Sequence, residues 1–406
     1  MPGPLTGMRV VEGSAFVAVP LAGMTLAQMG ADVIRFDRLE GGLDAHRWPV
    51  TKDGASLFWA GLNKGKRSIA VDMKSPRGRE IVTEIVTAPG EDAGLFITNL
   101  RVRGWMDHET LAKRRADLIT VTLLGDRHGR PQVDYTVNPA LGFPDATGPE
   151  GSADPVAHVL PAWDCIAGGM VVSALLAAER RRLRTGRGQA VDLSLKDAAA
   201  SVMGALGIIG EVAVNGMDRP KYGNALYGAY GQDFLCADGG RIMVIGLTDR
   251  QWHTLLKVTG TEAAMDALAA RLGVDLEAEG ARFEARAEIT ALLAPWFAAR
   301  PAAEAGAALD AAGCTWSQFR SFAQAVAEDP DLSPANPMMH LIDQPGIGTY
   351  PVPGSPIHFG EGPRVPPAPA PALGQHTEEI LADVARLPDI EIAKLFDAGV
   401  VAGPRG

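Results

Sequence analysis

One stretch, from Leu160 to Asp197, constrains the fold more than any other part of this sequence. Its apolar run, Cys165 to Ala178, ends in a basic segment, Arg180 to Arg184. An apolar run that begins after an acidic residue and ends in cations predicts a helix, because the helix N-terminus favours negative charge and the C-terminus favours positive charge. Thr185 to Gly188 then predicts a turn, and the alternation from Ala190 to Leu195 predicts a strand.

Asp164 stands directly before that apolar run, and its position supports two interpretations. In the first, Asp164 is the N-cap that satisfies free backbone N–H groups at the helix start. In the second, it is a nucleophilic carboxylate held at a helix N-terminus, and the two interpretations are compatible. The pair Gly168-Gly169 costs the helix about 1 kcal/mol per glycine. This cost indicates that another group approaches the backbone closely at these positions.

The residues of this stretch also form a recognisable pattern: Asp164 precedes Ala167-Gly168-Gly169, followed by Leu175 to Ala178 and by Thr185 to Gln189. The pattern resembles the class III CoA-transferases, a family that also contains the α-methylacyl-CoA racemases. The resemblance implies an enzyme that acts on acyl-CoA thioesters, with Asp164 as a covalent nucleophile. It also implies an α/β fold in which coenzyme A is part of the substrate and no cofactor is tightly bound.

The composition, with 47% hydrophobic and 21% charged residues among 406, is ordinary for a soluble globular enzyme. The net charge of −10 (38 − 48) disfavours a nucleic-acid partner. Cys165, Cys236 and Cys314 are odd in number and far apart, which favours reduced thiols in the cytoplasm. No His or Cys spacing suggests a metal site, and no apolar run reaches the ~18 residues of a membrane span. We therefore expect a cytoplasmic enzyme without metal or membrane contact.

The N-terminal segment is predicted to run strand, helix, strand: Met8 to Val11, Val19 to Met29, and Asp32 to Phe36. This order is typical of a dinucleotide-binding unit. The first turn, Glu12 to Val17, however, has one glycine where a pyrophosphate cradle needs three, which disfavours nicotinamide and flavin. The resemblance implies instead a Rossmann-like unit that holds coenzyme A.

Coenzyme A carries a diphosphate and a 3′-phosphate, so cations near strand ends are candidates to bind it. Residues 62–68 place three cations before a predicted strand, although such charges often mark only a solvated loop. The resemblance assigns the coenzyme site to seven residues, Val17, Arg38, Leu62, Lys66, Asn99, Leu100 and Arg103. Arg101 is the alternative to Arg103. The family often has a polar residue where this chain has Val17.

Four parts are expected along the chain. These are a large Rossmann-like CoA-binding domain (1–210), a linker and lid loop (211–232), a smaller α/β domain (233–330) and a return segment (331–406) that packs on the large domain. We expect residues 344–359 to be poor in strands, Pro363 to Pro371 to form an extended strap, and Thr377 to cap a final helix. The resemblance also implies a homodimer with interlocked subunits.

Two further residues are candidates to contact the acyl group. Tyr227 lies in the glycine- and tyrosine-rich run Tyr222 to Gly231, which suits an active-site lid as well as a domain linker. Arg47 follows Arg38 in the same predicted loop and is a candidate to hold a substrate carboxylate. The alternative for Arg47 is a surface salt bridge.

Within the family, four runs (Val11 to Ala18, Trp59 to Ser68, Asp134 to Pro139 and His158 to Asp164) resemble a branch that moves CoA between the C-1 and C-4 carboxylates of mesaconate. An intermolecular transferase for another dicarboxylic acid, a racemase-like enzyme and an inactive CoA-binding regulator remain alternatives. The racemases carry a catalytic His-Asp dipeptide where this chain has Val133-Asp134, and His128 lies earlier. Abstraction of an α-proton therefore lacks one of its two bases.

Overall fold

A computed structural model describes residues 3–100, 104–360 and 364–404, and the chain divides into two compact units. Unit 1 comprises 1–141, 159–215 and 329–406, and unit 2 comprises 142–158 and 216–328. Compared with the boundaries expected from sequence, residues 142–158 belong to the smaller unit, and residues 211–215 belong to the larger one. The two units are described separately below.

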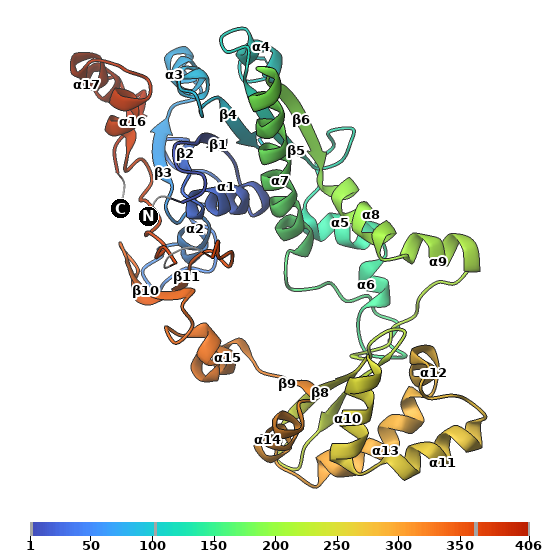
Figure 1. Ribbon diagram of the computed structural model, residues 1–406. Coiled ribbons are helices and arrows are strands. Elements are labelled where there is room, and N and C mark those ends of the chain that lie inside the picture. Colours follow the sequence, from blue (N-terminus) through green and yellow to red (C-terminus); the bar gives the residue numbers. More distant parts are fainter. Residues whose placement is uncertain (1–2, 101–103, 361–363, 405–406) are drawn as a thin grey trace. The chain divides into compact units, whose positions relative to one another are not determined.

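Unit 1 is built around a seven-stranded sheet with the order β12-β3-β2-β1-β4-β5-β6 (Figure 1). Its strands are β1 (Arg9–Gly13), β2 (Asp32–Asp37), β3 (Arg67–Val71), β4 (Leu95–Thr98), β5 (Ile119–Leu124), β6 (Gln189–Ser194) and β12 (Val401–Ala402). All neighbouring strands are parallel except the pair β12–β3. The strand order reverses between β1 and β4, and Rossmann-like folds bind ligands beyond the carboxyl ends of the strands at this point.

Helices cover both faces of this sheet, so its central strands are largely buried, although β1 and β2 also carry the buried charges Glu12, Arg35 and Asp37. The helices of unit 1 are α1 (Ala18–Gln28), α2 (Leu57–Leu62), α3 (Pro76–Thr87), α4 (His108–Ala112), α5 (Asp134–Ala140), α7 (Ala162–Thr185), α8 (Leu195–Ala205), α9 (Ile208–Asn215), α16 (Thr377–Asp383) and α17 (Asp389–Asp397). Helices α1 and α7 pack on each other and on β4, while residues of α3, α16 and α17 share one core with β1 to β4.

The long helix α7 confirms the helix predicted after Leu160, and it ends at Gly186, whose φ of 68° is the left-handed conformation that glycine adopts without strain. A Cβ atom on Gly168 would lie 2.8 Å from the carbonyl oxygen of Ala18. The close approach predicted for the glycine pair is therefore made by α1 at Gly168, whereas a Cβ atom on Gly169 would meet nothing within 4 Å, so the prediction is wrong for Gly169. In length and hydropathy α7 alone would suffice to cross a membrane, and the bent pair α8–α9 would pass the same test together. Because α7 packs on α1, β4 and β5, it serves as a core helix of this unit.

The C-terminal segment returns to unit 1, where β12 pairs with β3 and α16 packs on the same strand. Thr377 is the first residue of α16 and its hydroxyl donates to the carbonyl of Ala402, so the expected N-cap role of Thr377 is wrong; His376 precedes the helix. In the strap, of which Pro363 lies outside the described residues, the backbone of Ala370 is held by the Gln344 amide (2.8 and 2.9 Å).

The hairpin β10 (Met339–Gln344) and β11 (Gly348–Pro353) corrects the expectation that 344–359 is poor in strands. Pro351 and Pro353 lie in β11, which has β10 as its only partner among the described strands. Proline is tolerated in such an edge strand because one side of the strand needs no ladder hydrogen bonds.

Unit 2 contains a three-stranded antiparallel sheet, β7 (Tyr230–Leu235), β8 (Arg241–Gly246) and β9 (Thr315–Gln318). Its helices are α6 (Phe143–Ala146), α10 (Asp249–Thr259), α11 (Glu262–Leu272), α12 (Glu279–Glu284), α13 (Arg286–Ala298), α14 (Ala302–Ala312) and α15 (Phe322–Glu328). The buried ammonium of Lys221 donates to the carbonyls of Thr147 (2.9 Å) and Asp154, and Gly223 donates to Gly148 (3.2 Å). These bonds explain why residues 142–158 belong to unit 2.

Candidate active site

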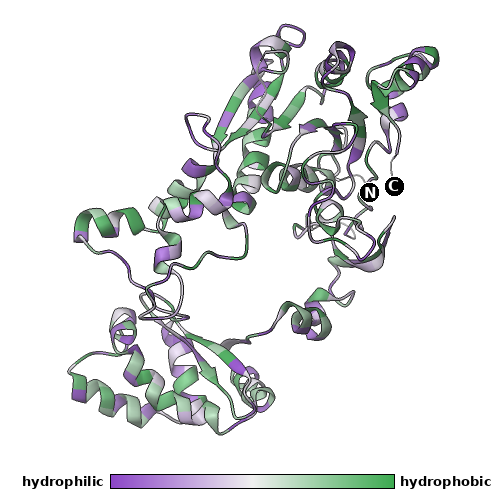
Figure 2. Cartoon of the chain, turned by 180° about the vertical axis from the view of Figure 1, so that it is seen from behind, coloured by the Kyte–Doolittle hydropathy of each residue, from purple (hydrophilic) through white to green (hydrophobic). Residues whose placement is uncertain are grey.

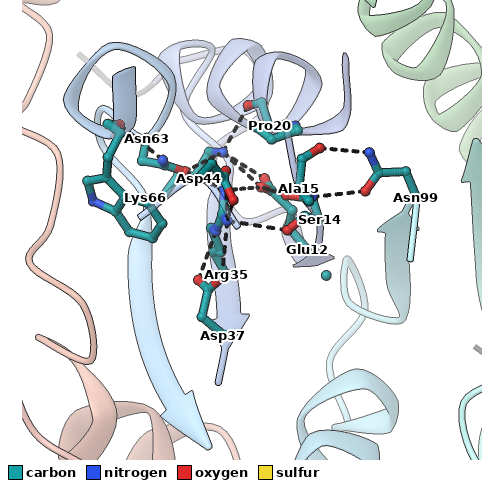
Figure 3. Close-up of polar contacts among 12 residues, drawn as sticks. Glu12, Ser14, Ala15, Pro20, Arg35, Asp37, Asp44, Asn63, Lys66 and Asn99 are labelled. Carbon is teal, nitrogen blue, oxygen red and sulfur yellow. Dashed lines mark hydrogen bonds and ion pairs between the residues drawn. The ribbon is translucent and has the colours of Figure 1, made fainter. Parts of the chain in front are cut away.

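A group of fully buried charges lies beneath the loops that follow β1 and β2; we call it the buried ion cluster and define it as Glu12, Arg35, Asp37, Asp44 and Lys66 (Figure 3). The guanidinium of Arg35 binds Asp37 (2.8 Å) and Asp44 (3.0 Å). The ammonium of Lys66 binds Glu12 (2.8 Å). Buried charges are costly unless they are paired in this way.

The electrostatics of the buried ion cluster follow from burial and close contact. Burial works against the charge of Arg35, and the carboxylates of Asp37, Asp44 and Glu12 outweigh it, so the pKa of Arg35 lies above its usual value. Burial lowers the pKa of Lys66 to about 8, with Glu12 opposing the change. Burial also raises the pKa of Asp44, against the attraction of Arg35. The cluster fixes Asp44, which begins the loop that carries Arg47.

The Arg47 guanidinium lies between two aromatic rings, each 5.3 Å from its centre, those of Phe16 and Phe58. Phe16 has φ = 66°, a strained conformation for a bulky residue, and this conformation directs its ring toward Arg47. The backbone N–H of Arg47 donates to the carbonyl of Asp44 (3.3 Å). In the described part of the chain Arg47 forms no ion pair, so the surface salt bridge that was its alternative assignment is not found there.

Asp164 lies in the first turn of α7, which begins two residues earlier at Ala162. The expected N-cap role of Asp164 is therefore wrong. The carboxylate of Asp134, from α5, caps this helix instead: its Oδ2 accepts the backbone N–H groups of Trp163 (2.7 Å) and Asp164 (3.2 Å). Among residues 3–100, 104–360 and 364–404, no hydrogen bond or ion pair is made to the side chain of Asp164.

The pKa of Asp164 reflects this environment. Burial, and after it the Asp134 carboxylate, raise the pKa of Asp164 to about 6, against the opposing effect of the positive charge of Arg47. At neutral pH Asp164 is therefore largely ionised, and its anion is poorly stabilised by hydrogen bonds. A carboxylate of this kind is a better nucleophile than one that is fully solvated.

A cavity of about 520 Å³ lies beyond the carboxyl ends of β1 to β4 in unit 1. Six of its lining residues are Arg38, Leu39, Met73, Lys74, Leu100 and Trp105. Arg38 is exposed and follows β2 directly, and Lys74 supplies a second cation that the sequence analysis did not single out. Cations beside apolar walls, at the point where the strand order reverses, suit a phosphorylated nucleotide.

The other predicted coenzyme residues lie outside this cavity lining. Lys66 has no exposed side-chain surface, since its ammonium also binds the Asn63 amide oxygen (3.0 Å) and the Pro20 carbonyl (2.8 Å). A direct contact of Lys66 with a phosphate stays a prediction that this geometry does not favour. The Asn99 amide makes two hydrogen bonds to the backbone of Ala15 and so fixes the first turn (Figure 3).

Three further residues complete the predicted set. Val17 precedes α1 and is half-buried. Leu62 ends α2 and is also half-buried. Arg103 and its alternative Arg101 lie outside the described residues.

The predicted lid belongs to unit 2, where Tyr227 packs against other rings. The ring centres of Tyr222 and Phe283 lie 5.6 and 5.2 Å from that of Tyr227, and the Arg219 guanidinium lies 3.8 Å from its centre. These contacts hold the run from Tyr222 onto the body of unit 2. A contact of Tyr227 with substrate stays a prediction.

The position of the racemase histidine is occupied by Val133, the residue before α5. His128 lies in a turn that the Asp126 carboxylate fixes by accepting the N–H groups of His128 (2.9 Å) and Arg130 (2.9 Å). In the sequence, Val133-Asp134 indicates only the absence of the racemase imidazole. No sequence signal marks Asp134 as the residue whose carboxylate binds the backbone of Asp164.

Comparison with known proteins agrees with this geometry. The model for CoA-transferase family III matches residues 5–377. The chain belongs to this family. It is 57% identical to a 2-methylfumaryl-CoA isomerase from Chloroflexus aurantiacus, over 100% of this chain and 99% of that protein. A succinyl-CoA:mesaconate CoA-transferase from Haloarcula hispanica is 27% identical over 93% of this chain and 96% of its own length.

Among solved structures, a CaiB/BaiF family protein from Brucella suis superposes with a TM-score of 0.76 at 28% identity, over 94% of this chain and 100% of that one. The mixed α/β fold with a large parallel sheet is thus shared with this family, as the sequence predicted. Family membership also establishes the chain as an enzyme, a class III CoA-transferase.

Proposed function

We propose that this enzyme is a 2-methylfumaryl-CoA isomerase, which moves CoA between the C-1 and C-4 carboxylates of mesaconate. The observation that carries the proposal is the Asp164 carboxylate at the start of α7. In the described chain this carboxylate has no hydrogen-bond partner, and the nearby Arg47 forms no ion pair. The 57% identity along the full length of the Chloroflexus enzyme supports the substrate. The alternative is an intermolecular transfer, which the name of the Haloarcula relative supports.

In the first half-reaction an oxygen of Asp164 attacks the thioester carbonyl carbon at C-1. The carbon–sulfur bond breaks, CoA leaves as a thiolate, and a mixed anhydride joins Asp164 to the acyl group. The thiolate then attacks the Asp164 carbonyl carbon of the anhydride. This step leaves an aspartyl-CoA thioester and releases the C-1 carboxylate of mesaconate.

The second half-reaction repeats these steps at the other end of the same molecule. The C-4 carboxylate attacks the aspartyl thioester, thiolate leaves again, and a new anhydride forms. Thiolate attack at C-4 gives the isomeric thioester and regenerates the Asp164 carboxylate. No proton, electron or outside group is consumed, and each intermediate must be kept from water.

Arg47 is the residue that we assign to the idle carboxylate of the substrate. Its guanidinium is positioned by Phe16 and Phe58, is exposed, and presents paired donors that match a carboxylate. Arg47→Gln is expected to raise KM about 10- to 100-fold, the loss of one charged hydrogen-bonded pair. An unchanged KM for mesaconyl-CoA would remove Arg47 from the site.

Coenzyme A would place its nucleotide in the cavity beyond β1 to β4, with Arg38 at the phosphates. Arg38→Met should raise KM for every acyl-CoA while leaving kcat nearly unchanged, because the nucleotide takes no part in bond breaking. A crystal structure of the complex with the nucleotide away from Arg38 would contradict this placement. The same structure would decide whether Lys66 has any contact with phosphate.

The intramolecular character of the transfer is tested by a crossover experiment. Unlabelled mesaconyl-C1-CoA is converted in the presence of isotopically labelled free mesaconate, and the C-4 product is analysed by mass spectrometry. Transfer within one molecule predicts almost no label in the product. Label incorporation at the rate of turnover would establish the intermolecular alternative, and deuterium uptake at an α-carbon from heavy water would establish a racemase.

We also propose a homodimer in the cytoplasm. Helix α9 carries mostly apolar residues, as Figure 2 shows, although none of its residues is buried in the single chain. The same is true of α15, where Phe322 is 85% exposed. Such faces are typical of subunit interfaces. Light scattering at micromolar concentration should give twice the mass of the chain, and a monomer would contradict the proposal.

A further inference from the structure

Asp134, which matches the aspartate of the racemases' His-Asp dipeptide, makes contacts in unit 1 that the sequence does not predict. It is the first residue of α5 and is 1% exposed. One of its carboxylate oxygens accepts the N–H groups of Trp163 and Asp164 at 2.7 and 3.2 Å. The Trp163 indole in turn donates to the Asn138 side chain (3.1 Å), so α5 holds the first turn of α7 at two points.

This arrangement reduces the stabilisation that the N-terminus of α7 can give to the Asp164 carboxylate. A helix N-terminus normally stabilises an anion through its free N–H groups and its dipole. Here two of those N–H groups are directed at Asp134. The Asp164 carboxylate therefore lies beside a helix start where two of the donors already serve another carboxylate, and this carboxylate accepts no hydrogen bond in the described chain.

We propose that Asp134 is a positioning residue that fixes the backbone of Asp164 and whose negative charge favours the neutral, acylated forms of Asp164 over the free carboxylate. The inference rests on the proposed role of Asp164 as nucleophile. When Asp164 forms the anhydride or the CoA thioester, its charge passes to the leaving thiolate and then to the substrate carboxylate. Repulsion by Asp134 is relieved in both forms.

Three titratable groups near Asp164 are relevant to the proposed role of Asp134. Asp134 approaches from α5, Arg47 from the loop after β2, and the Cys165 thiol from α7 itself. After burial, Asp134 is the main cause of the raised pKa of Asp164, and Arg47 acts in the opposite sense. The negative charge that leaves Asp164 moves toward the acyl group, where Arg47 is proposed to lie. Asp134 thus disfavours the negative charge on Asp164, and Arg47 would stabilise that charge once it lies on the substrate.

The test uses Asp134→Asn and Asp134→Ser, which remove the charge but keep an oxygen that can accept the two N–H groups. The acid limb of the kcat/KM profile should move to lower pH by roughly half to one unit, since a nearby like charge has been removed. At pH 8, kcat/KM should fall about three- to tenfold, because one pKa unit corresponds to a factor of ten. The share of enzyme trapped as the CoA thioester during turnover should fall as well.

A matched control is available in unit 2, where Asp238 caps α14 from another segment by accepting the Ala302 N–H (3.1 and 3.2 Å). Asp238→Asn should affect stability alone. A wild-type pH profile in the Asp134 variants, or the same shift in Asp238→Asn, would overturn the inference. Failure of both Asp134 variants to fold would make Asp134 a folding requirement and overturn it too.

A wrong assignment of Asp164 as the nucleophile would give a different experimental result from a wrong assignment of Asp134. In that case the wild-type enzyme itself would form no CoA adduct at Asp164. The shift of the Asp164 pKa by Asp134→Asn would still appear in the pH dependence of thermal unfolding.

Discussion

Unit 1 contains two groups of carboxylates whose charges are balanced in different ways. In the buried ion cluster, three carboxylates meet Arg35 and Lys66 at hydrogen-bond distance. At the start of α7, the Asp164 carboxylate lies near Asp134 and near Arg47, and neither Asp164 nor Arg47 forms an ion pair in the described chain. Both groups lie in the same unit, one beneath the loops after β1 and β2 and the other where α5 meets α7.

The difference separates a structural role from a reactive one. In the buried ion cluster the partners are fixed, the charges cannot move without breaking several contacts, and the cluster positions the loop that carries Arg47. At the start of α7, Asp134 repels the ionised Asp164 carboxylate, and acylation of Asp164 would remove that repulsion. A protein tolerates such a site only when the surrounding structure holds it in place.

The largest effect is expected from Asp164→Asn, which leaves a side chain of the same shape but a much weaker nucleophile. Activity should fall by several decades, on the order of the losses found for other catalytic nucleophiles. The measurement is isomerisation of mesaconyl-CoA, with circular dichroism to show that the fold is intact. More than about a tenth of the wild-type rate in a sample free of deamidated enzyme would exclude Asp164 as the nucleophile.

The second effect should appear when the buried ion cluster is broken. Arg35→Met leaves Asp37 and Asp44 buried without their main partner, which should cost about 3–5 kcal/mol of the free energy of unfolding. Arg114→Met is the control, since Arg114 pairs with Glu80 at the surface (2.7 Å) and such pairs contribute about 0–1 kcal/mol. If chemical denaturation gave the two variants equal losses in the free energy of unfolding, Arg35 would contribute no more to stability than a surface ion pair.

The sequence predicted the parts of this comparison that depend on local pattern. The apolar run and basic end of α7, the alternation of β6 and the Gly168 contact follow from helix and strand periodicity, and the structure confirms them. Asp164 was found because its residue pattern matches a family. The sequence does not predict the position of Asp164 within the helix. That position depends on where α7 begins, and the Asp134 carboxylate from α5 binds the backbone N–H groups at this point.

The features that the sequence does not reveal depend on contacts between residues far apart in the chain. Asp134 and Asp164 are separated by 30 positions, and nothing in either segment reveals that they meet. Lys66 was assigned to a phosphate because sequence shows a charge but not the direction of its side chain, and Glu12 lies 54 positions away. Arg47 stays a candidate for the substrate carboxylate, and only the three-dimensional structure reveals that it forms no ion pair in the described chain.

The smallest expected effect is on the pH dependence of stability, and it distinguishes Asp164 from the carboxylates of the buried ion cluster without an activity assay. The pKa of Asp164 is raised to about 6 in the folded protein, so ionised Asp164 destabilises the fold, and this cost is absent below about pH 4 and complete above about pH 6. Asp164→Asn should therefore be more stable than wild type at pH 8 by about 1–2 kcal/mol, allowing for partial exposure, and should lose that advantage at pH 4. Thermal unfolding of both proteins across this range gives the difference directly. A carboxylate paired as in the buried ion cluster would show the opposite sign, with the Asn variant less stable at pH 8, and that outcome would place Asp164 among the structural residues of the chain.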